Sequence, residues 1–139
     1  MSPRKRPATI LVLDSELGFL FALSHELAQR EISAFPARSA AEARGLITQF
    51  SLRLDLLVLN CSCSGACGLA KEVAEANSTL KVIAMTSPGH ACAGCASLIS
   101  VHFRDPDDRE PERIGHYADV IEMLVRGRRS RAHRAGTKD

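Results

Sequence analysis

Short apolar runs alternate with amphipathic segments along most of this chain. The runs "TILVL" at 9–13 and "LDLLVLN" at 54–60 are rich in aliphatic residues, which predicts strands buried on both faces. The segments that follow them repeat apolar residues every three or four positions, as an amphipathic helix does. We therefore expect strands at 9–13, 33–37, 54–60, 81–86 and 98–103, and helices at 17–31, 40–50, 69–77 and 111–124.

Two segments depart from this regular alternation. Pro36 lacks a backbone N–H, so the strand that contains it is expected at an edge of the sheet. Residues 87–95 are mostly small and include one proline and two glycines. A helix in that segment should be short, because such residues specify helical structure weakly.

Five strands alternating with helices predict an α/β fold: a single domain with a five-stranded parallel sheet, helices on both faces and right-handed crossovers. The length of 139 residues fits one domain. No apolar run approaches the roughly 20 residues that a membrane-spanning helix needs. The first apolar stretch is interrupted by Asp14 and Glu16, which argues against a secretory signal, so we expect a cytoplasmic protein without membrane contact.

Charge is distributed unevenly, although the whole chain carries only +2. Residues 7–125 hold 9 Lys and Arg against 15 Asp and Glu, a formal charge of −6, and both ends are basic. This pattern predicts a basic extension at 1–7, a folded domain at 8–126 and a disordered basic tail at 127–139, where large apolar side chains are almost absent. The tail could simply aid solubility, or it could contact nucleic acid or anionic lipid.

Polar residues follow the predicted strands at their carboxyl ends, where functional groups gather in doubly wound sheets. The segments "ILVLDSE", "LLVLNCSCSGACG" and "VIAMTS" resemble, in order and spacing, the receiver domain of bacterial two-component response regulators, from Thr9 to about Arg126. The resemblance implies a flavodoxin-like topology with a shortened fourth helix. Asp14, Asn60, Gly68 and Thr86 fall on its motif positions.

The departures from the family pattern concern its phosphorylation pocket. In the family, two adjacent carboxylates and a phosphoacceptor aspartate hold magnesium. Here Ser15 replaces the second carboxylate and Asn60 replaces the phosphoacceptor. An amide is not the nucleophile that forms an acyl phosphate, and losing two negative charges removes most of the attraction for magnesium. We expect no phosphorylation at Asn60 and no bound magnesium.

Two further family positions leave alternatives open. Thr86 matches the switch hydroxyl, yet a threonine at a strand end can also serve only to satisfy backbone groups. The lysine that the family carries near the end of its last strand has no obvious counterpart, and His102 and Arg104 are the two candidates.

The five cysteines lie in two loops that should share one rim of the sheet. Thiolates at such spacing could bind zinc, with His90 as a further ligand, or an iron–sulfur cluster, or they could form a redox disulfide. They could equally be small side chains that fill half-buried loops. The cluster consists of Cys61, Cys63, Cys67, Cys92 and Cys95.

Together these features predict a stand-alone pseudo-receiver: a non-enzymatic signalling protein of the two-component or phosphorelay type, without a cofactor, acting by protein–protein interaction independent of phosphorylation. The resemblance implies that its partner is a kinase, a regulator or an output protein, or a second copy in a homodimer. It also implies an interaction face made by the fourth helix, the fifth strand and the last helix. The alternative is a redox or metal sensor that uses the cysteine cluster.

Overall fold

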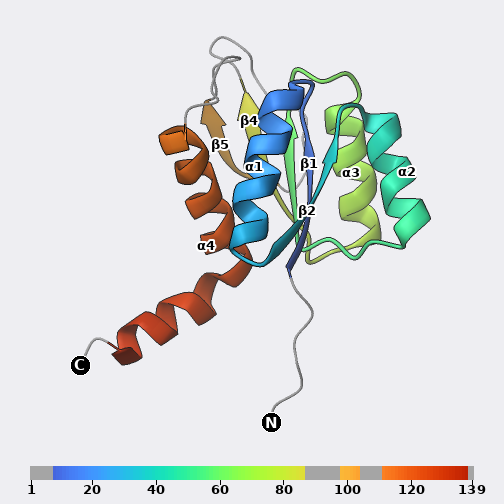
Figure 1. Cartoon of the computed structure of the whole chain (residues 1–139). Helices are drawn as coiled ribbons and strands as arrows, with labels where there is room; N and C mark the ends of the chain where they lie inside the picture. Colours follow the sequence, from blue (N-terminus) through green and yellow to red (C-terminus); the bar gives the residue numbers. More distant parts are fainter. Residues whose placement is uncertain (1–7, 87–97, 104–110, 138–139) are drawn as a thin grey trace.

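The computed structural model describes residues 8–86, 98–103 and 111–137. Strands and helices alternate through most of these residues (Figure 1). The elements are β1 (Ala8–Leu13), α1 (Leu17–Gln29), β2 (Ile32–Ala37), α2 (Ala40–Phe50), β3 (Leu56–Asn60), α3 (Ala66–Ala76), β4 (Lys81–Thr86), β5 (Leu98–Phe103) and α4 (Pro111–Thr137).

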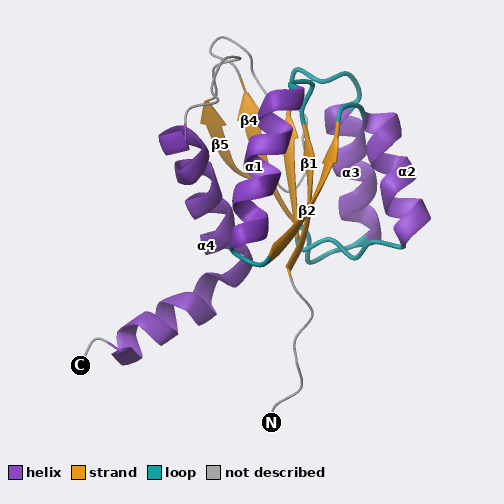
Figure 2. Cartoon of the chain, in the orientation of Figure 1, coloured by secondary structure: helices purple, strands orange, loops and turns teal. Residues whose placement is uncertain are grey.

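The strands form one parallel sheet in the order β2-β1-β3-β4-β5. Helices α1 and α4 cover one face, and α2 and α3 cover the other (Figure 2). The predicted α/β fold with a parallel sheet and helices on both faces is therefore confirmed. Connections run from β1 outward in both directions, so the order of the strands reverses between β1 and β3. Such a switch point is where α/β sheets place their functional groups.

The sheet carries an apolar core on each face, because successive side chains of a strand point to opposite sides. In β1, Ile10 and Val12 belong to the core under α1 and α4, whereas Leu11 and Leu13 belong to the core under α2 and α3. In the first core the rings of Phe19 and Tyr117 meet edge to face, with centroids 5.7 Å apart. Because both faces of β1 are buried, its sequence is a continuous apolar run.

Most element boundaries lie within a few residues of those predicted, and α3 shows the clearest difference. It begins at Ala66, not at Leu69, because Ala66 is already buried against the sheet. Its N-cap is Gly65, whose φ of 78° is a left-handed conformation that glycine adopts without strain. Pro36 lies in β2, the first strand in the sheet order, so the predicted edge position is confirmed.

The last helix is longer than predicted. It continues to Thr137, through most of the segment 127–139 that was expected to be disordered (Figure 1). Arginine and alanine are frequent there and have high helix propensities, so the helix can continue where apolar residues run out. The short helix predicted within 87–97 lies outside the described residues. Among the helices described, none has the length and apolar character that a membrane span requires.

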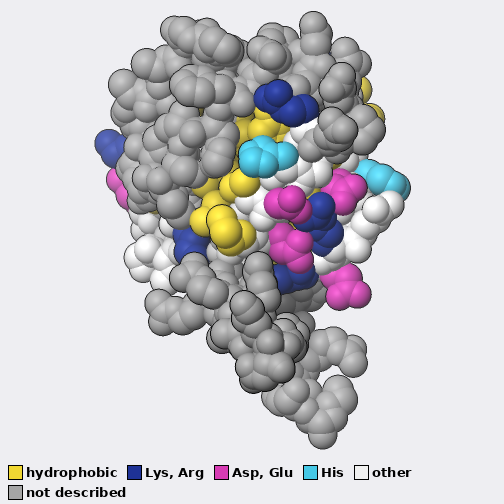
Figure 3. Space-filling view, turned by 90° about the vertical axis from the view of Figure 1, so that its left-hand side faces the viewer, with side chains coloured by type: hydrophobic (Ala, Val, Ile, Leu, Met, Phe, Trp, Pro, Cys, Tyr) yellow, Lys and Arg dark blue, Asp and Glu magenta, His cyan; other side chains and the backbone are white. Residues whose placement is uncertain are grey.

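Arg30 joins α1 to α4 through a network of ion pairs. Figure 3 shows acidic and basic side chains gathered on one face of the molecule. Its guanidinium donates to Glu26 at 3.1 Å, to Asp119 at 2.6 Å and to Glu122 at 3.1 Å. The hydrogen bond with Asp119 raises the pKa of Arg30 above its ordinary value. Arg126 pairs with Glu122 and donates to the Arg30 carbonyl at 2.7 Å. The network fixes α4 against the end of α1.

We expect Arg30→Met to lower the free energy of unfolding by about 1–2 kcal/mol, because one substitution removes several charge-assisted bonds around a side chain that is only 20% exposed. Urea denaturation followed by circular dichroism measures the change. Arg44→Met is the matched control: it removes a single pair with Glu72 in which both side chains are exposed, and should cost less than about 0.5 kcal/mol. Equal losses in the two variants would contradict a special role for Arg30.

Candidate functional site

The site predicted at the switch point is built from the ends of two neighbouring strands. Asp14 directly follows β1, and Asn60 is the last residue of β3. The two strands are paired, with Leu13 opposite Leu59, so their carboxyl ends lie together. Asp14 is 1% exposed and Asn60 is 6% exposed. The structure thus buries side by side two polar residues that stand 46 positions apart in the sequence.

A direct hydrogen bond joins these two side chains. Asn60 Nδ2 donates to Asp14 Oδ2 at 3.2 Å. The other amide atom, Asn60 Oδ1, accepts from the backbone N–H of Ser62 at 2.9 Å and from its hydroxyl at 2.7 Å. A reversed amide would set its NH2 group against the Ser62 N–H, donor against donor, and its oxygen against a carboxylate. The network therefore fixes the amide with its nitrogen toward Asp14.

Both side chains also shape the loops that begin at the ends of their strands. Asp14 Oδ1 accepts from the Glu16 N–H at 2.8 Å, two residues on, as Asn60 Oδ1 does from Ser62. Aspartate and asparagine commonly form such turns with their own backbone. The Asp14 N–H donates to the Ala37 carbonyl at 3.0 Å, which ties the first loop to the end of β2. The Asp14–Asn60 bond consequently couples the β1–α1 loop to the β3–α3 loop.

The donor set does not fit magnesium. This ion prefers six oxygen ligands in an octahedron, usually with carboxylates among them. Asn60 presents N–H groups, not an oxygen, toward Asp14, and its oxygen accepts from Ser62. Ser15, which the sequence resemblance aligns with the family's second acid, is exposed. Asp14 is then the one carboxylate among the four predicted pocket residues, and its oxygens already accept hydrogen bonds.

Other predicted residues lie along the same edge or outside the described part. Thr86 is the last residue of β4, the neighbour of β3, so its backbone lies at the same end of the sheet. His102 lies within β5, opposite Met85, and Arg104 lies outside the described residues. Gly68 is in the first turn of α3, where a Cβ would meet nothing within 4 Å. Space alone does not require glycine at this position.

The cysteines of the β3–α3 loop show two chemical states. Cys61 is disulfide-bonded, whereas Cys63 and Cys67 are half-buried thiols. Cys61 and Cys63 pack against the core under α2 and α3, in keeping with the interpretation that they fill the loop. Cys92, Cys95 and His90 lie outside the described residues. Within the described part of the chain, no group of three or more His, Cys, Asp or Glu side chains gathers as a metal site would require.

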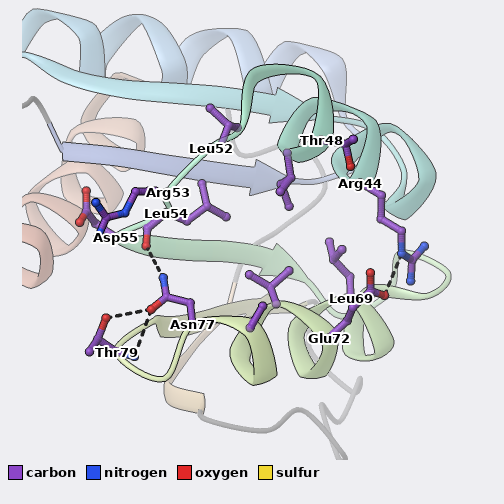
Figure 4. Close-up of a pocket in the computed structure, with 13 residues that line it drawn as sticks. Arg44, Thr48, Leu52, Arg53, Leu54, Asp55, Leu69, Glu72, Asn77 and Thr79 are labelled. Atoms are coloured by element: carbon purple, nitrogen blue, oxygen red, sulfur yellow. Dashed lines mark hydrogen bonds and ion pairs between the residues drawn. The ribbon is translucent and has the colours of Figure 1, made fainter.

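A groove of about 400 Å³ lies away from this site, between α2 and α3 (Figure 4). Apolar side chains such as Leu69 form part of its wall, and an Arg44–Glu72 ion pair of 3.0 Å closes one end. At the other end, Asn77 Nδ2 donates to the Leu54 carbonyl at 3.0 Å. The polar groups at the two ends of the groove thus connect elements of the protein to each other, and we assign the groove no function.

Ser62 is the contributor to the site that the sequence analysis missed. Its hydroxyl and N–H hold the Asn60 oxygen and so determine which amide atom faces Asp14. The available signal was the spacing: a serine two residues after an asparagine at a strand end is typical of an Asx turn.

Comparisons with known proteins locate this arrangement within a known fold. Neither a protein-family model nor a curated protein sequence matches the chain. Solved structures do match. The response regulator TrrA from Thermotoga maritima, in complex with Mg²⁺-BeF, is 21% identical with a TM-score of 0.64, over 84% of this chain and 98% of that one.

Two further structures agree with this match. The signal receiver domain of an HD domain-containing protein from Pseudomonas fluorescens Pf-5 is 17% identical with a TM-score of 0.70, over 96% of this chain and 98% of that one. A two-component response regulator from Clostridium difficile is 24% identical with a TM-score of 0.66, over 87% of this chain and 98% of that one. The chain therefore has the fold of response regulator receiver domains.

We expect Asn60→Asp to lower the free energy of unfolding at pH 7 by about 2–3 kcal/mol, because it places a second buried carboxylate against Asp14 and raises the pKa of the pair. The folded state then binds more protons than the unfolded state. Stability should therefore fall as pH rises through the raised pKa, and recover as pH falls toward the unfolded value of about 3.9. Chemical denaturation at a series of pH values measures this.

Asn60→Leu serves as the control, since it removes the amide without adding charge. It should show a smaller inverse pH dependence than Asn60→Asp, because it removes one donor from Asp14 but adds no second carboxylate, and the difference between the two variants isolates the charge repulsion. Magnesium should stabilise Asn60→Asp more than the wild type or Asn60→Leu, because a cation can neutralise two facing carboxylates. A wild-type pH profile in Asn60→Asp would contradict the predicted repulsion.

Proposed function

We propose that this chain is a pseudo-receiver that acts in two-component or phosphorelay-type signalling by protein–protein interaction, independently of phosphorylation and without enzymatic activity of its own. The observation that carries the proposal is the buried Asn60 amide at the end of β3, held by both Asp14 and Ser62. The receiver fold supports a role in signalling. The amide at the position that the resemblance assigns to the phosphoacceptor supports a role without phosphorylation.

The chemistry of Asn60 supports phosphorylation independence. A carboxylate attacks phosphorus with an anionic oxygen, whereas an amide oxygen carries no full charge and its nitrogen lone pair is delocalised. The Asn60 oxygen in addition accepts two hydrogen bonds from Ser62. Asp14, the remaining carboxylate, accepts hydrogen bonds at both oxygens and is 1% exposed, a poor placement for a nucleophile.

The same contact supports a single conformation in place of a switch. Two carboxylates at these positions would repel each other unless a cation lay between them. Here an N–H group of Asn60 faces the Asp14 carboxylate, so the two side chains attract each other without a cation. The loops after β1 and β3 are then coupled without a metal or a phosphoryl group, and we propose that the surface they support is presented constitutively.

The proposed partner is a protein of the same signalling systems. One matching solved structure is a complex of the histidine kinase ThkA with the response regulator TrrA, and TrrA is 21% identical to this chain. Another is HP1043, described as an orphan response regulator of H. pylori, at 12% identity and a TM-score of 0.67. By analogy, we propose that the partner of this chain is a kinase, a regulator or an output protein in a bacterial cytoplasm. We propose that β5 and α4 belong to the interaction face.

We expect no phosphoryl adduct when the wild-type protein is incubated with acetyl phosphate and magnesium, because residue 60 is an amide and not a carboxylate. Intact-mass spectrometry detects a phosphoryl group as an addition of about 80 Da. The positive control is the double variant Ser15→Asp/Asn60→Asp, which rebuilds the acidic cluster and should gain an acid-labile adduct. An adduct on the wild type that Asp14→Asn removes would overturn phosphorylation independence.

A second candidate function, a redox sensor, is favoured by one specific observation. Cys61 is disulfide-bonded, and it directly follows Asn60 at the edge of the sheet that carries the site. Its N–H donates to the Met85 carbonyl at 3.3 Å, so the cysteine lies where β3 and β4 end together. A change in the redox state of Cys61 would act on the loop that Asn60 and Ser62 shape. The metal-sensor form of this alternative has no comparable support in the described residues.

If this alternative holds, reduction should raise the intact mass of the wild-type protein by about two mass units, because two thiols replace one disulfide. Cys61→Ser should abolish the shift, whereas Cys63→Ser, in the same loop, should keep it. Titration against glutathione buffers would then show whether the transition lies within the range of a cell. Equal masses before and after reduction of anaerobically purified protein would remove the support for a redox role.

A further inference from the structure

Helix α4 has two parts that differ in their relation to the body. Up to Arg126 it is attached: Ile121 is fully buried, the Leu124 carbonyl accepts from Lys81 Nζ at 3.2 Å, and Arg126 donates to the Arg30 carbonyl at 2.7 Å. Beyond this point the helix continues to Thr137 and leads away from the sheet (Figure 1). The second part thus begins where the described contacts of α4 with the body end.

The projecting part is strongly basic. The sequence from 127 to 137 is "GRRSRAHRAGT", which carries four arginines and no acidic residue. The arginines stand at 128, 129, 131 and 134. The body, residues 7–125, carries a formal charge of −6. Positive charge is therefore concentrated in one segment, and an anionic partner would be attracted to the helix and repelled by the body.

The residue types of this segment favour nucleic acid over an anionic membrane. A guanidinium binds phosphate oxygens through two parallel N–H groups, and four of the five basic residues here are arginines. Helices that lie in a membrane interface need bulky apolar side chains on one face, whereas this segment has only alanine, glycine, serine and threonine besides its basic residues. Its small and polar residues permit close approach to a phosphate backbone.

We propose that residues 127–137 form a nucleic-acid-binding segment that contacts the phosphate backbone of duplex DNA without sequence preference. Eleven helical residues span about 16 Å, which matches about five phosphates along one strand. The four arginines can supply at most four phosphate contacts. This inference goes beyond the pseudo-receiver proposal and does not rest on it, since it concerns a segment outside the sheet and its loops.

The test uses the full chain and a fluorescein-labelled DNA duplex of about 20 base pairs with a mixed sequence, followed by fluorescence polarisation. Four contacts predict a slope of log K against log salt of about −3.6, equivalent to a loss of about 150-fold between 50 and 200 mM salt. The variant Arg128→Gln/Arg131→Gln should weaken binding at 0.1 M salt at least about tenfold, because glutamine keeps the helix propensity and removes two contacts.

A matched variant separates a local site from net charge. Arg38→Gln/Arg53→Gln removes the same charge from two exposed arginines of the body and should change affinity less than about twofold. Equal losses in the two double variants would overturn the proposal, as would an absence of DNA binding at low salt. Binding to vesicles with anionic headgroups in preference to DNA would also overturn it. Circular dichroism of each variant verifies that the body remains folded.

Discussion

A carboxylate that is buried must be compensated by hydrogen-bond donors or by a cation, and in this protein the compensation of Asp14 organises the edge of the sheet. The Asn60 amide and the Glu16 N–H provide donors, and Ser62 fixes the amide in the orientation that makes donation possible. The contact joins strands β1 and β3 at the switch point, and through the turns that begin there it joins their loops. The function that we propose depends on this one contact, because it replaces a chemistry of phosphate and metal with a fixed hydrogen bond.

The two faces of the sheet are stabilised in different ways. Under α2 and α3, the core consists of aliphatic side chains and alanines, and the exposed Arg44–Glu72 pair adds little at its rim. Under α1 and α4, the aromatic contact of Phe19 with Tyr117 fills the core, and the half-buried network around Arg30 closes its end. The attachment of α4 therefore rests on apolar burial over its first half and on charge near Arg126. This division sets the point at which the helix becomes independent of the sheet.

The sequence predicted the fold well, because strands buried on both faces leave a signal that needs no alignment. "TILVL" and "LLVLN" are continuous apolar runs, and Pro36 marks an edge by what its backbone lacks. The meeting of Asp14 and Asn60 also followed from topology. What could not be predicted was the bond between them, since the choice of amide atom depends on Ser62 and on a loop geometry that composition does not encode. The start of α3 at Ala66 depends on burial of a small residue and has no local signature. A redox disulfide was among the alternatives for the cysteine cluster, but that Cys61 takes part in it depends on spatial proximity.

Pro36 has one more consequence, which concerns the growth of the sheet. The carbonyl of Ala37 faces β1, where it accepts from the Asp14 N–H. Because alternate residues of a parallel strand direct their backbone groups to opposite sides, the backbone of Pro36 faces the open edge. An incoming strand would meet a missing donor there and could not complete its ladder. The molecule is thereby protected against strand-by-strand polymerisation at the β2 edge, and pairing of a further strand is left to the opposite edge, formed by β5.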